Sequence, residues 1–322
     1  MIRALAVTGP TASGKTAVSL SLAKEIGAHI ICCDSMQIYK FMDIGTAKPT
    51  PEEKAQVPHY MTDFLPPTED FSAQSYRKMA LDAAEKIVKL GKIPLFVGGT
   101  GLYIDTLLRR GADEVPESDP EYQSKLLEEY QGEGGAELLW QRLNNVDPVS
   151  AEKIHRNNVR RVIRALEIFE KTGKTKTYFD EQSRIGCDDV SIGMITLDFH
   201  DRENLYKRCD ERVDKMISEG LVGEVEGLYS KGLLPTESTA AQAIGYKEIV
   251  EYLKREITLC EAVEKVKLST RRYAKRQLTW FRHSDAVRIY ADGEDGKMRS
   301  YDELCREVIL AAKGLVSEWS KT

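Results

Sequence analysis

The sequence of 322 residues lacks the features that define several common classes of protein. It has no apolar run near the ~20 residues that a membrane-spanning helix needs. The first apolar strand begins at Ile2, which leaves no room for a signal peptide. The six cysteines form no C-x-x-C pair, which argues against a zinc ribbon and against a disulfide scaffold. We therefore expect a protein of the reducing cytoplasm with no membrane partner, in which Cys32 and Cys33 are core residues.

Two further absences concern ligands. His59, His155, His200 and His283 share no spacing, so we expect no metal–histidine site. An excess of basic residues is also absent, because the formal net charge is −5, and this value alone argues against a protein that binds nucleic acid. A binding face needs only a local basic patch, however, and the positive charges of this chain are clustered.

The most informative segment is the octet at residues 9–16, which fits the phosphate-loop pattern G-x-x-x-x-G-K-[ST] at every fixed position. Its members are Gly9, Pro10, Thr11, Ala12, Ser13, Gly14, Lys15 and Thr16. An apolar strand precedes it and a helical pattern follows it, so backbone N–H groups and a helix N-terminus would face one anion. Lys15 would place a charge on the outer phosphates, and the Thr16 hydroxyl would bind Mg²⁺. The alternative is a glycine-rich turn that binds nothing.

Strands and helices alternate along the N-terminal third of the chain. Apolar strands at 2–7, 29–33 and 93–97 are separated by helical patterns that end at Gly27 and Gly91. This order predicts an α/β fold: a P-loop NTPase-like core with a parallel sheet flanked by helices.

The composition changes near Gly111, where an acidic stretch that reaches Pro120 predicts a hinge. The pattern is then helical, so we expect residues 119–184 to form an all-helical insertion domain, and residues 1–118 and 185–322 to form the α/β core with C-terminal helices. Within the later part we expect a strand at 191–197, helices at 202–218, 223–231, 241–255 and 260–282, a last strand at 287–290 and a terminal helix at 301–319.

Two strand ends should face the phosphate loop, because ligands of open α/β sheets lie at the carboxyl ends of the strands. Asp34 follows the second strand, where a carboxylate is suited to be a general base or to support a metal, or else to cap a turn. The third strand runs into Gly98-Gly99-Thr100-Gly101, where a nucleotide hydrolase has a Mg²⁺-binding aspartate. This difference argues against an ordinary ATPase or GTPase. The glycines would admit a base or ribose, or would form only a tight turn.

Positive charges gather in two stretches, residues 153–176 and residues 267–282, and the second contains no acid. Tyr273, Trp280 and Phe281 lie within the second stretch, and such rings stack on unpaired bases at about 1–3 kcal/mol each. Two basic stretches in an otherwise acidic chain favour RNA or another polyanion as partner. The alternative is a pair of solvated helix faces, with Trp280 and Phe281 in the core.

Arg208 and Arg212 lie one helical turn apart. They would clamp a pyrophosphate leaving group opposite the phosphate loop. Ion pairs with Asp210, Glu211 or Asp214 are the alternative.

Five segments together resemble the bacterial tRNA dimethylallyltransferases, also called tRNA isopentenyltransferases. They are residues 9–16, Asp34–Tyr39, Met42–Pro49, Gly98–Tyr103 and Gln242–Glu248, in this order along nearly the whole chain. The resemblance implies transfer of a dimethylallyl group from dimethylallyl diphosphate to N6 of the adenosine 3′-adjacent to the anticodon in tRNA, with release of diphosphate. The partners would be dimethylallyl diphosphate and the anticodon stem-loop of tRNA. Mg²⁺ would be the cofactor, and we expect a monomer.

The resemblance also implies roles for individual residues. Asp34, as the base that accepts the N6 proton, and Thr100 would be catalytic, and residues 9–16 would hold the donor. The insertion domain would contact tRNA, and the full set of contacts would be Asp34, Ser35, Met36, Gln37, Thr100, Gln123, Arg160, Arg161, Val162, Ile163, Arg164, Gln242, Ala243, Ile244, Gly245, Tyr246 and Lys247. Gln123 departs from this pattern because it is uncharged. We expect no C-terminal zinc finger of the kind found in eukaryotic relatives.

Two other functions stay open at this point. The first is a small-molecule or nucleotide kinase that uses ATP on the same loop. The second is a non-catalytic RNA-binding protein that uses a nucleotide only as a switch.

Overall fold

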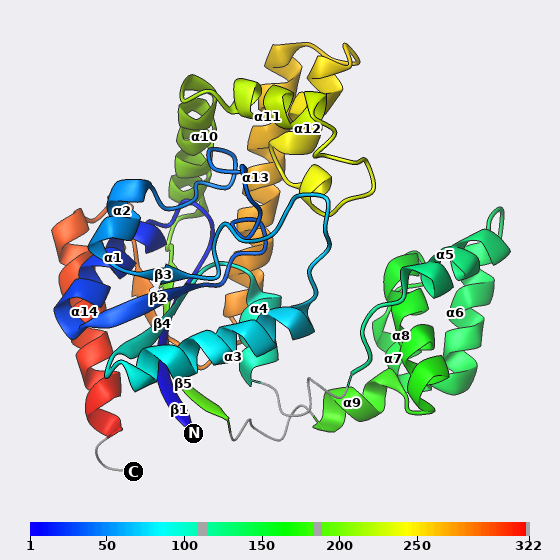
Figure 1. Cartoon of the computed structure of the whole chain (residues 1–322), viewed down its shortest axis with the longest axis horizontal. Helices are drawn as coiled ribbons and strands as arrows, with labels where there is room; N and C mark the ends of the chain where they lie inside the picture. The colour runs from blue at the N-terminus through cyan, green and yellow to red at the C-terminus, as the bar shows by residue number, and fades with distance from the viewer. Residues whose placement is uncertain (109–114, 183–188, 320–322) are drawn as a thin grey trace. The chain divides into compact units, whose positions relative to one another are not determined.

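The computed structural model describes residues 1–108, 115–182 and 189–319. It divides into two compact units (Figure 1): the first comprises Met1–Phe71, Tyr76–Ile104 and Val190–Thr322, and the second comprises Ser72–Ser75 and Asp105–Asp189. Each unit has a hydrophobic core of its own. Cys187, part of the predicted hinge and the predicted domain boundary at 184–185 lie outside the described residues.

The first unit is built on a six-stranded sheet in which every pairing is parallel. The strands are β1 (Ile2–Thr8), β2 (Ala28–Cys32), β3 (His59–Tyr60), β4 (Ile93–Val97), β5 (Val190–Asp198) and β6 (Val287–Tyr290), in the order β3-β2-β4-β1-β5-β6 across the sheet. The predicted α/β fold is therefore confirmed. The edge strand β3 was not predicted, because two residues are too short to show a hydrophobic period.

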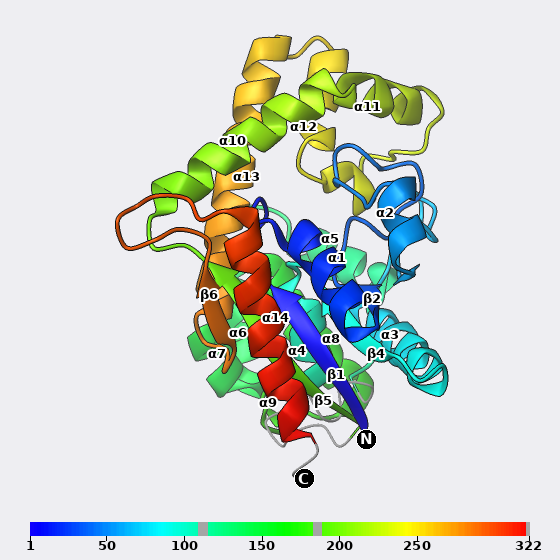
Figure 2. The ribbon, with the colours of Figure 1, turned by 90° about the vertical axis from the view of Figure 1, so that its left-hand side faces the viewer.

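The helices that precede and follow these strands in the chain are α1 (Lys15–Ile26), α2 (Pro51–Gln56), α3 (Ala73–Lys89), α4 (Gly101–Leu108), α10 (Arg202–Ser218), α11 (Leu221–Ser230), the 3₁₀ turn η2 (Ala240–Gln242), α12 (Tyr246–Leu253), α13 (Leu259–Phe281) and α14 (Tyr301–Glu318). Helices α11 and α12 pack on each other and on α10 and α13 around a hydrophobic cluster of their own. Helices α1 and α14 lie side by side (Figure 2), and Val18, Leu22 and Val308 from them pack with Leu5 and Val7 of β1 in one core. Because all strands point the same way, the loops after β1, β2 and β4 meet at one edge of the sheet.

Three local predictions were wrong. The helix expected over 241–255 is interrupted, because Gly245 adopts φ 93° and separates η2 from α12. The helical pattern expected to end at Gly91 stops earlier, because α3 ends at Lys89 and Leu90 is exposed. Of the two aromatic residues that the alternative placed in the core, Phe281 is buried whereas Trp280 is exposed.

The second unit is helical, with α5 (Pro120–Glu129), α6 (Gly135–Val146), α7 (Pro148–Lys153), α8 (Val159–Thr172) and α9 (Lys176–Gln182). Asp119 and Asp147 cap α5 and α7, each followed by a proline at the first helical position. Asp147 also accepts hydrogen bonds from the Thr177 amide (3.0 Å) and hydroxyl (2.5 Å), which connects α7 to α9. Across the described ranges of the whole chain, no helix combines the length and apolarity that membrane crossing requires.

Candidate active site

The phosphate loop joins β1 to α1 at the carboxyl edge of the sheet. Gly9 has φ 134°, and a Cβ there would lie 2.5 Å from the carbonyl oxygen of Leu197, so only glycine fits. Gly14 begins α1 with φ 92° and no side-chain cap. The first N–H groups of α1 therefore have no capping side chain and are placed to meet an anion.

Three positive side chains surround the loop. The Lys15 Nζ donates to the carbonyl oxygen of Pro10 at 2.6 Å, and the Arg208 Nε donates to the carbonyl oxygen of Ala12 at 2.7 Å. Burial and the nearby Arg212 guanidinium lower the pKa of Lys15 to about 7, against an opposing effect of Asp34. Burial also lowers the pKa of Arg212. These charges are partly withdrawn from water with few anions to balance them, which favours an anionic ligand.

Ser13 gives a second indication of a ligand. Its hydroxyl is buried at 2% exposure and has no hydrogen-bond partner among the described residues. An unsatisfied buried hydroxyl costs about 1–3 kcal/mol, which an oxygen of a bound phosphate would recover.

Asp34 and Thr100 form the opposite side of the site. Asp34 Oδ1 accepts from the amide of Met36 at 2.9 Å, which is the turn cap that was the alternative role for this residue. The Thr100 hydroxyl accepts from the amide of Ser35 at 3.1 Å. The neighbouring glycine Gly98 lies against the backbone of Cys33, since a Cβ there would lie 2.2 Å from the Cys33 carbonyl oxygen. These contacts place the ends of β2 and β4 side by side.

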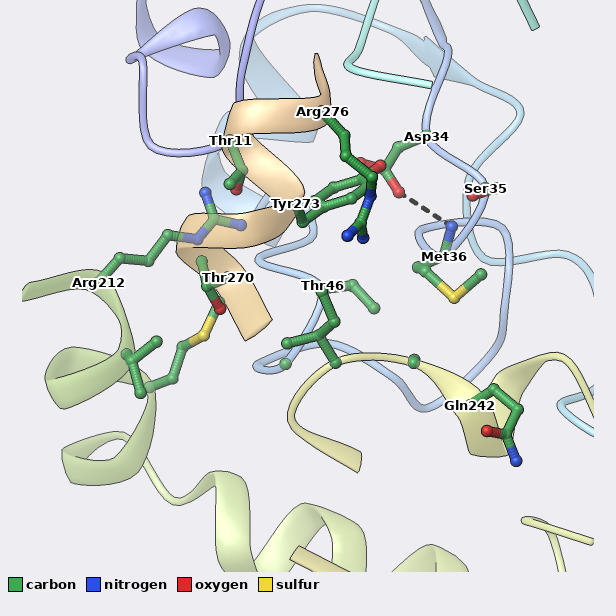
Figure 3. Close-up of a pocket in the computed structure, with 15 residues that line it drawn as sticks. Thr11, Asp34, Ser35, Met36, Thr46, Arg212, Gln242, Thr270, Tyr273 and Arg276 are labelled. Atoms are coloured by element: carbon green, nitrogen blue, oxygen red, sulfur yellow. Dashed lines mark hydrogen bonds between the residues drawn. The ribbon is translucent and has the colours of Figure 1, made fainter. Parts of the chain in front are cut away.

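A cavity of about 260 Å³ lies between these elements (Figure 3). Eight of its lining residues were predicted as site residues: Thr11, Asp34, Ser35, Met36, Arg212, Gln242, Ala243 and Ile244. The others are Gly45 and Thr46 of the Met42–Pro49 segment, Thr270, Tyr273 and Arg276 of the second basic stretch, and Val213 and Met216, which belong to none of the stretches singled out from the sequence. The cavity thus brings a carboxylate, two guanidinium groups, one aromatic ring and apolar side chains to one place.

A second cavity of about 630 Å³ shares Arg212 and Met216 with the first. Thr16 of the phosphate loop opens into it, together with Lys54 and Lys215. Arg212 therefore stands between a space beside the carboxylate and a space beside the end of the phosphate loop.

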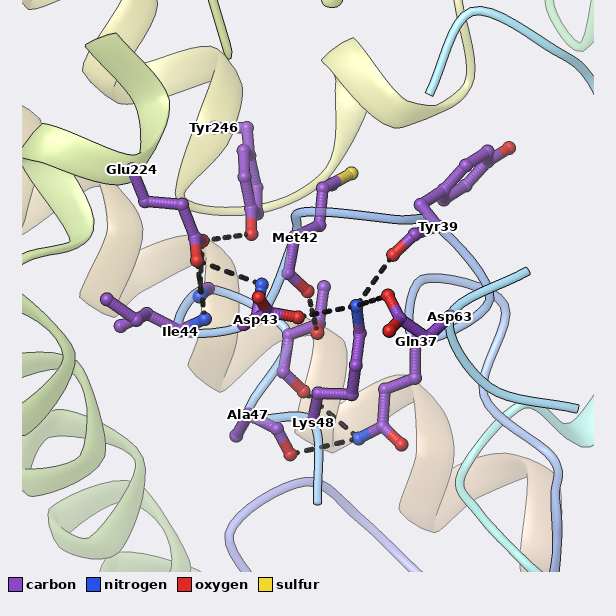
Figure 4. Close-up of polar contacts among 12 residues, drawn as sticks. Gln37, Tyr39, Met42, Asp43, Ile44, Ala47, Lys48, Asp63, Glu224 and Tyr246 are labelled. Atoms are coloured by element: carbon purple, nitrogen blue, oxygen red, sulfur yellow. Dashed lines mark hydrogen bonds and ion pairs between the residues drawn. The ribbon is translucent and has the colours of Figure 1, made fainter. Parts of the chain in front are cut away.

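A network of polar contacts holds the loop at residues 43–48 (Figure 4). The Glu224 carboxylate accepts from the amides of Asp43, Ile44 and Gly45 at 2.9, 2.8 and 3.1 Å, and from the Tyr246 hydroxyl at 2.5 Å. A Cβ at Gly45 would lie 2.4 Å from the Tyr246 ring. Glu224 thus joins the loop that carries Gly45 to the segment that precedes α12, which are two walls of the cavity.

The buried side chain of Lys48 stabilises the same loop. Its ammonium group is buried and contacts Asp43 at 2.6 Å, Asp63 at 2.8 Å and the carbonyl oxygen of Tyr39 at 2.8 Å (Figure 4). Gln37, a predicted contact residue, donates to the carbonyl oxygens of Thr46 and Ala47 at 3.1 Å each. Neither Glu224 nor Lys48 was predicted as a site residue. The loop partners of Glu224 lie about 180 positions away in the sequence, and those of Lys48, although 5 to 15 positions away, form no recognisable motif with it.

Gly245, Tyr246 and Lys247 do not line the cavity. Tyr246 is buried against Glu224, and the Lys247 ammonium group lies 3.7 Å from the carboxylate of Glu248. Gly245 supplies the backbone turn that starts α12. These residues therefore position the Gln242–Ile244 segment.

Some basic residues of the second basic stretch, on α13, form ion pairs with α10. Lys267 lies 2.7 Å from Asp214, and Arg271 donates to both carboxylate oxygens of Asp210 at 2.7 and 2.6 Å. Two of the three acids that were the alternative partners of the α10 arginines are thus bound by α13. Arg212 lines both cavities, and its predicted role at a pyrophosphate stays a prediction.

The remaining predicted contacts lie in the second unit and are described within it. Arg160 and Arg161 on α8 are exposed, whereas the side chains of Val162 and Ile163 are buried in its core. Arg164 donates to Glu167 Oε2 at 2.7 Å, as does the Gln123 side-chain amide at 2.9 Å. Among the predicted contact residues of α8, Arg160 and Arg161 are therefore exposed to a partner, whereas Val162 and Ile163 face inward.

The fold and this geometry define a phosphate-loop α/β protein in which a carboxylate faces the loop across a cavity. The family model described as IPP transferase matches residues 37–284, and the model described as isopentenyl transferase matches residues 2–66. The chain belongs to this family, the tRNA dimethylallyltransferases, which are prenyltransferases.

Individual relatives are similar over almost the whole chain. A tRNA dimethylallyltransferase of Thermoanaerobacter sp. (strain X514) is 45% identical over 97% of this chain and 98% of its own, and one of Bacillus cereus (strain AH187) is 47% identical over 91% of each. The crystal structure of a tRNA isopentenylpyrophosphate transferase from Bacillus halodurans is 37% identical, with a TM-score of 0.72 over 100% of this chain and 99% of that one.

A eukaryotic dimethylallyltransferase acting on tRNA extends the comparison. It is 28% identical, with a TM-score of 0.83 over 99% of this chain and 80% of that one. None of the relatives named here is a kinase, so they give the kinase alternative no support.

Proposed function

We infer that this protein transfers a dimethylallyl group from dimethylallyl diphosphate to N6 of the adenosine 3′-adjacent to the anticodon in tRNA, and releases diphosphate. Family membership supports the reaction. The observation that carries the assignment of residues is the cavity that Asp34 shares with Thr11 of the phosphate loop and with Arg212. A single substrate bound in this shared cavity would contact both the proposed proton acceptor and the proposed anion site.

The phosphate loop would bind the diphosphate of the donor. Backbone N–H groups, Lys15 and the Ser13 hydroxyl are available for its oxygens, and Arg212 faces the loop from α10. These groups would neutralise the charge that develops on the leaving diphosphate, and such electrostatic stabilisation makes the greatest contribution to the rate of many transfer reactions. The apolar side chains of Met36, Val213 and Met216 suit the dimethylallyl group.

Asp34 would act as the base. The N6 lone pair of adenine is delocalised into the ring, so the amine is a weak nucleophile that needs a proton acceptor as it attacks. The nitrogen forms a bond to C1 of the dimethylallyl group, the C1–O bond breaks with its electron pair on diphosphate, and the N6 proton passes to Asp34. The adenosine has to leave its stack to enter the cavity, and Tyr273 offers a ring for it to stack on.

Mg²⁺ fits this site as a cofactor held mainly by the donor. Within the described ranges there is no cluster of three or more His, Cys, Asp or Glu side chains suited to a metal. A hydroxyl ligand from Thr16 together with diphosphate oxygens and water is the set of ligands that Mg²⁺ prefers at phosphate sites. When bound, the ion would neutralise diphosphate charge, and Thr16 would orient it.

The test is an analysis of the product. Purified protein is incubated with dimethylallyl diphosphate, Mg²⁺ and tRNA that lacks the modification, and the tRNA is digested and its nucleosides are weighed by mass spectrometry. We expect N6-dimethylallyladenosine at the position 3′ of the anticodon and diphosphate release that depends on tRNA. Consumption of ATP without tRNA, and no modified nucleoside, would favour the kinase. A monomeric state and a place in the cytoplasm stay predictions.

A further inference from the structure

We propose that Gln277 of α13 is a positioning residue that fixes the spacing between the phosphate loop, which holds the donor, and the turn of Thr100, which faces the acceptor. The inference rests on the proposed prenyl transfer. Gln277 lies outside every segment that carries the family resemblance, and it does not line the cavity between the two substrates.

The side-chain amide of Gln277 bridges the two segments directly. Its Oε1 accepts from the amide of Thr11 at 2.7 Å, and its Nε2 donates to the carbonyl oxygen of Gly99 at 2.8 Å. Thr11 N can only donate and Gly99 O can only accept, so a single orientation of the Gln277 amide satisfies both. The side chain is buried at 5% exposure, where losing either partner is costly.

The Gln277 side chain packs closely against Gly99 and the phosphate loop. A Cβ at Gly99 would lie 2.2 Å from Gln277 Nε2 and 3.1 Å from the carbonyl oxygen of Gly9. The glycine that sequence analysis assigned to a base, a ribose or a turn therefore makes room for Gln277. Three chain segments that are distant in sequence meet here at contact distance.

The turn that Gln277 holds also contacts the segment that carries Asp34. Thr100 follows Gly99, and its hydroxyl accepts from the amide of Ser35 at 3.1 Å, next to Asp34. Tyr273, one helical turn before Gln277, lines the cavity. Bond formation needs reacting atoms about 3–3.5 Å apart, and a displacement of about 1 Å can cost about 10²-fold in rate. A side chain that sets the distance between the donor loop and the acceptor turn therefore controls the rate at saturation more than the affinity for either substrate.

The experiment compares Gln277→Met and Gln277→Glu with Thr279→Ala, an exposed control on the same helix. Single-turnover rates are measured with both substrates saturating, and dissociation constants for donor and tRNA and the melting temperature are measured for each variant. We expect both Gln277 variants to react at least about tenfold more slowly, with each dissociation constant within about threefold of wild type. In Gln277→Glu, one carboxylate oxygen still accepts from the Thr11 amide, but the second oxygen replaces the nitrogen that donates to the Gly99 carbonyl oxygen. Thr279→Ala should match the wild type.

Several results would overturn the proposal. Saturated rates within about twofold of wild type would do so, as would a loss confined to the dissociation constants. A parallel fall in melting temperature and in both affinities would assign Gln277 a structural role only, and so would failure of both variants to fold. If Gln277→Met alone fails to fold, the nearly isosteric Gln277→Glu carries the test. Absence of transfer by the wild type would instead refute the proposed function.

Discussion

One oxygen of the Asp34 carboxylate is held by a backbone amide. Oδ1 is held by the amide of Met36, which limits rotation of the carboxylate, while the residue lines the cavity that it shares with Thr11. A base that is already oriented loses little entropy when the substrate arrives. The turn contact is therefore compatible with the proposed role of Asp34 as the base.

Replacing Asp34 by Asn removes the proton acceptor but keeps an oxygen for the Met36 amide. We expect turnover to fall by about 10²–10⁴-fold, the range for loss of a general base, with little change in tRNA affinity. Single-turnover kinetics and a tRNA binding isotherm measure the two quantities, with Asp82→Asn on the exposed face of α3 as control. Normal turnover together with much weaker tRNA binding would assign Asp34 to recognition alone.

Lys15 makes donor binding depend on pH. Its pKa is lowered to about 7 by burial and Arg212, while Asp34 and Cys209 oppose the shift, so without donor the amine is mostly neutral above pH 7. Diphosphate favours the ammonium form, and binding above pH 7 should take up a proton. We expect donor affinity to fall by up to about tenfold per pH unit between pH 7 and 9.

Calorimetry in two buffers with different ionisation enthalpies measures this uptake. Lys15→Met should bind the donor more weakly and without a proton uptake of its own in this range. An affinity of the wild type that stays constant from pH 7 to 9, with no proton taken up, would show that Lys15 is charged before the donor binds.

Helix α11 carries Glu224, which stabilises a wall of the cavity without lining the cavity itself. Glu224 accepts hydrogen bonds from the backbone amides of residues 43–45 and from the Tyr246 hydroxyl, so it satisfies three amides that no strand or helix partner satisfies. This carboxylate orders the loop together with Lys48 and Gln37, and Gly45 and Thr46 of the loop form a wall of the cavity.

Glu224→Gln leaves one carbonyl oxygen where two carboxylate oxygens accept these bonds. We expect the free energy of unfolding to fall by about 1–3 kcal/mol and the KM for tRNA to rise, because the cavity wall loosens. Urea denaturation and steady-state kinetics measure the two effects, and Glu226→Gln, which is exposed on the same helix, is the control. Equal stability of the two variants would mean that the loop does not depend on Glu224.

The elements that sequence predicts well are those with a local cause. The phosphate loop, the strands β1, β2, β4, β5 and β6 and most helices follow from motif and hydrophobic period. Gln277 and Glu224 were missed because their partners lie 178 and 180 positions away, which no local pattern records. Val162 and Ile163 were named within a basic tract, yet the apolar face of α8 buries them. Local sequence patterns thus identify many residues of the candidate site, whereas tertiary contacts determine which of them line the cavity and which are buried elsewhere.

The charge of the whole chain is −5, so its affinity for tRNA depends on local groups. On α13, Lys267 and Arg271 pair with α10, while Arg272, Lys275 and Arg276 are exposed. On α8 the exposed basic residues include Arg160 and Arg161. Both units therefore offer basic groups to a polyanion.

Arg161→Ala should weaken tRNA binding without loss of stability. Each phosphate contact contributes about 0.7–0.9 to the slope of log affinity against log salt, so the slope should become shallower by about that amount. Arg164→Ala is the contrasting variant, because it removes a partner of the fully buried Glu167 and should lower stability. Titrations of tRNA at several salt concentrations, and urea denaturation, separate the two. An unchanged slope for Arg161→Ala would exclude this face from tRNA binding.

Prenyl transfer by this site requires the donor to lie between the phosphate loop and Asp34. The most direct measurement is a crystal structure of the protein with Mg²⁺ and an unreactive analogue of dimethylallyl diphosphate. We expect the diphosphate to contact the backbone of residues 9–16, Lys15 and Arg212, with its C1 carbon facing the cavity that Asp34 lines. A diphosphate bound away from the loop, or a C1 carbon remote from that carboxylate, would contradict the central claim.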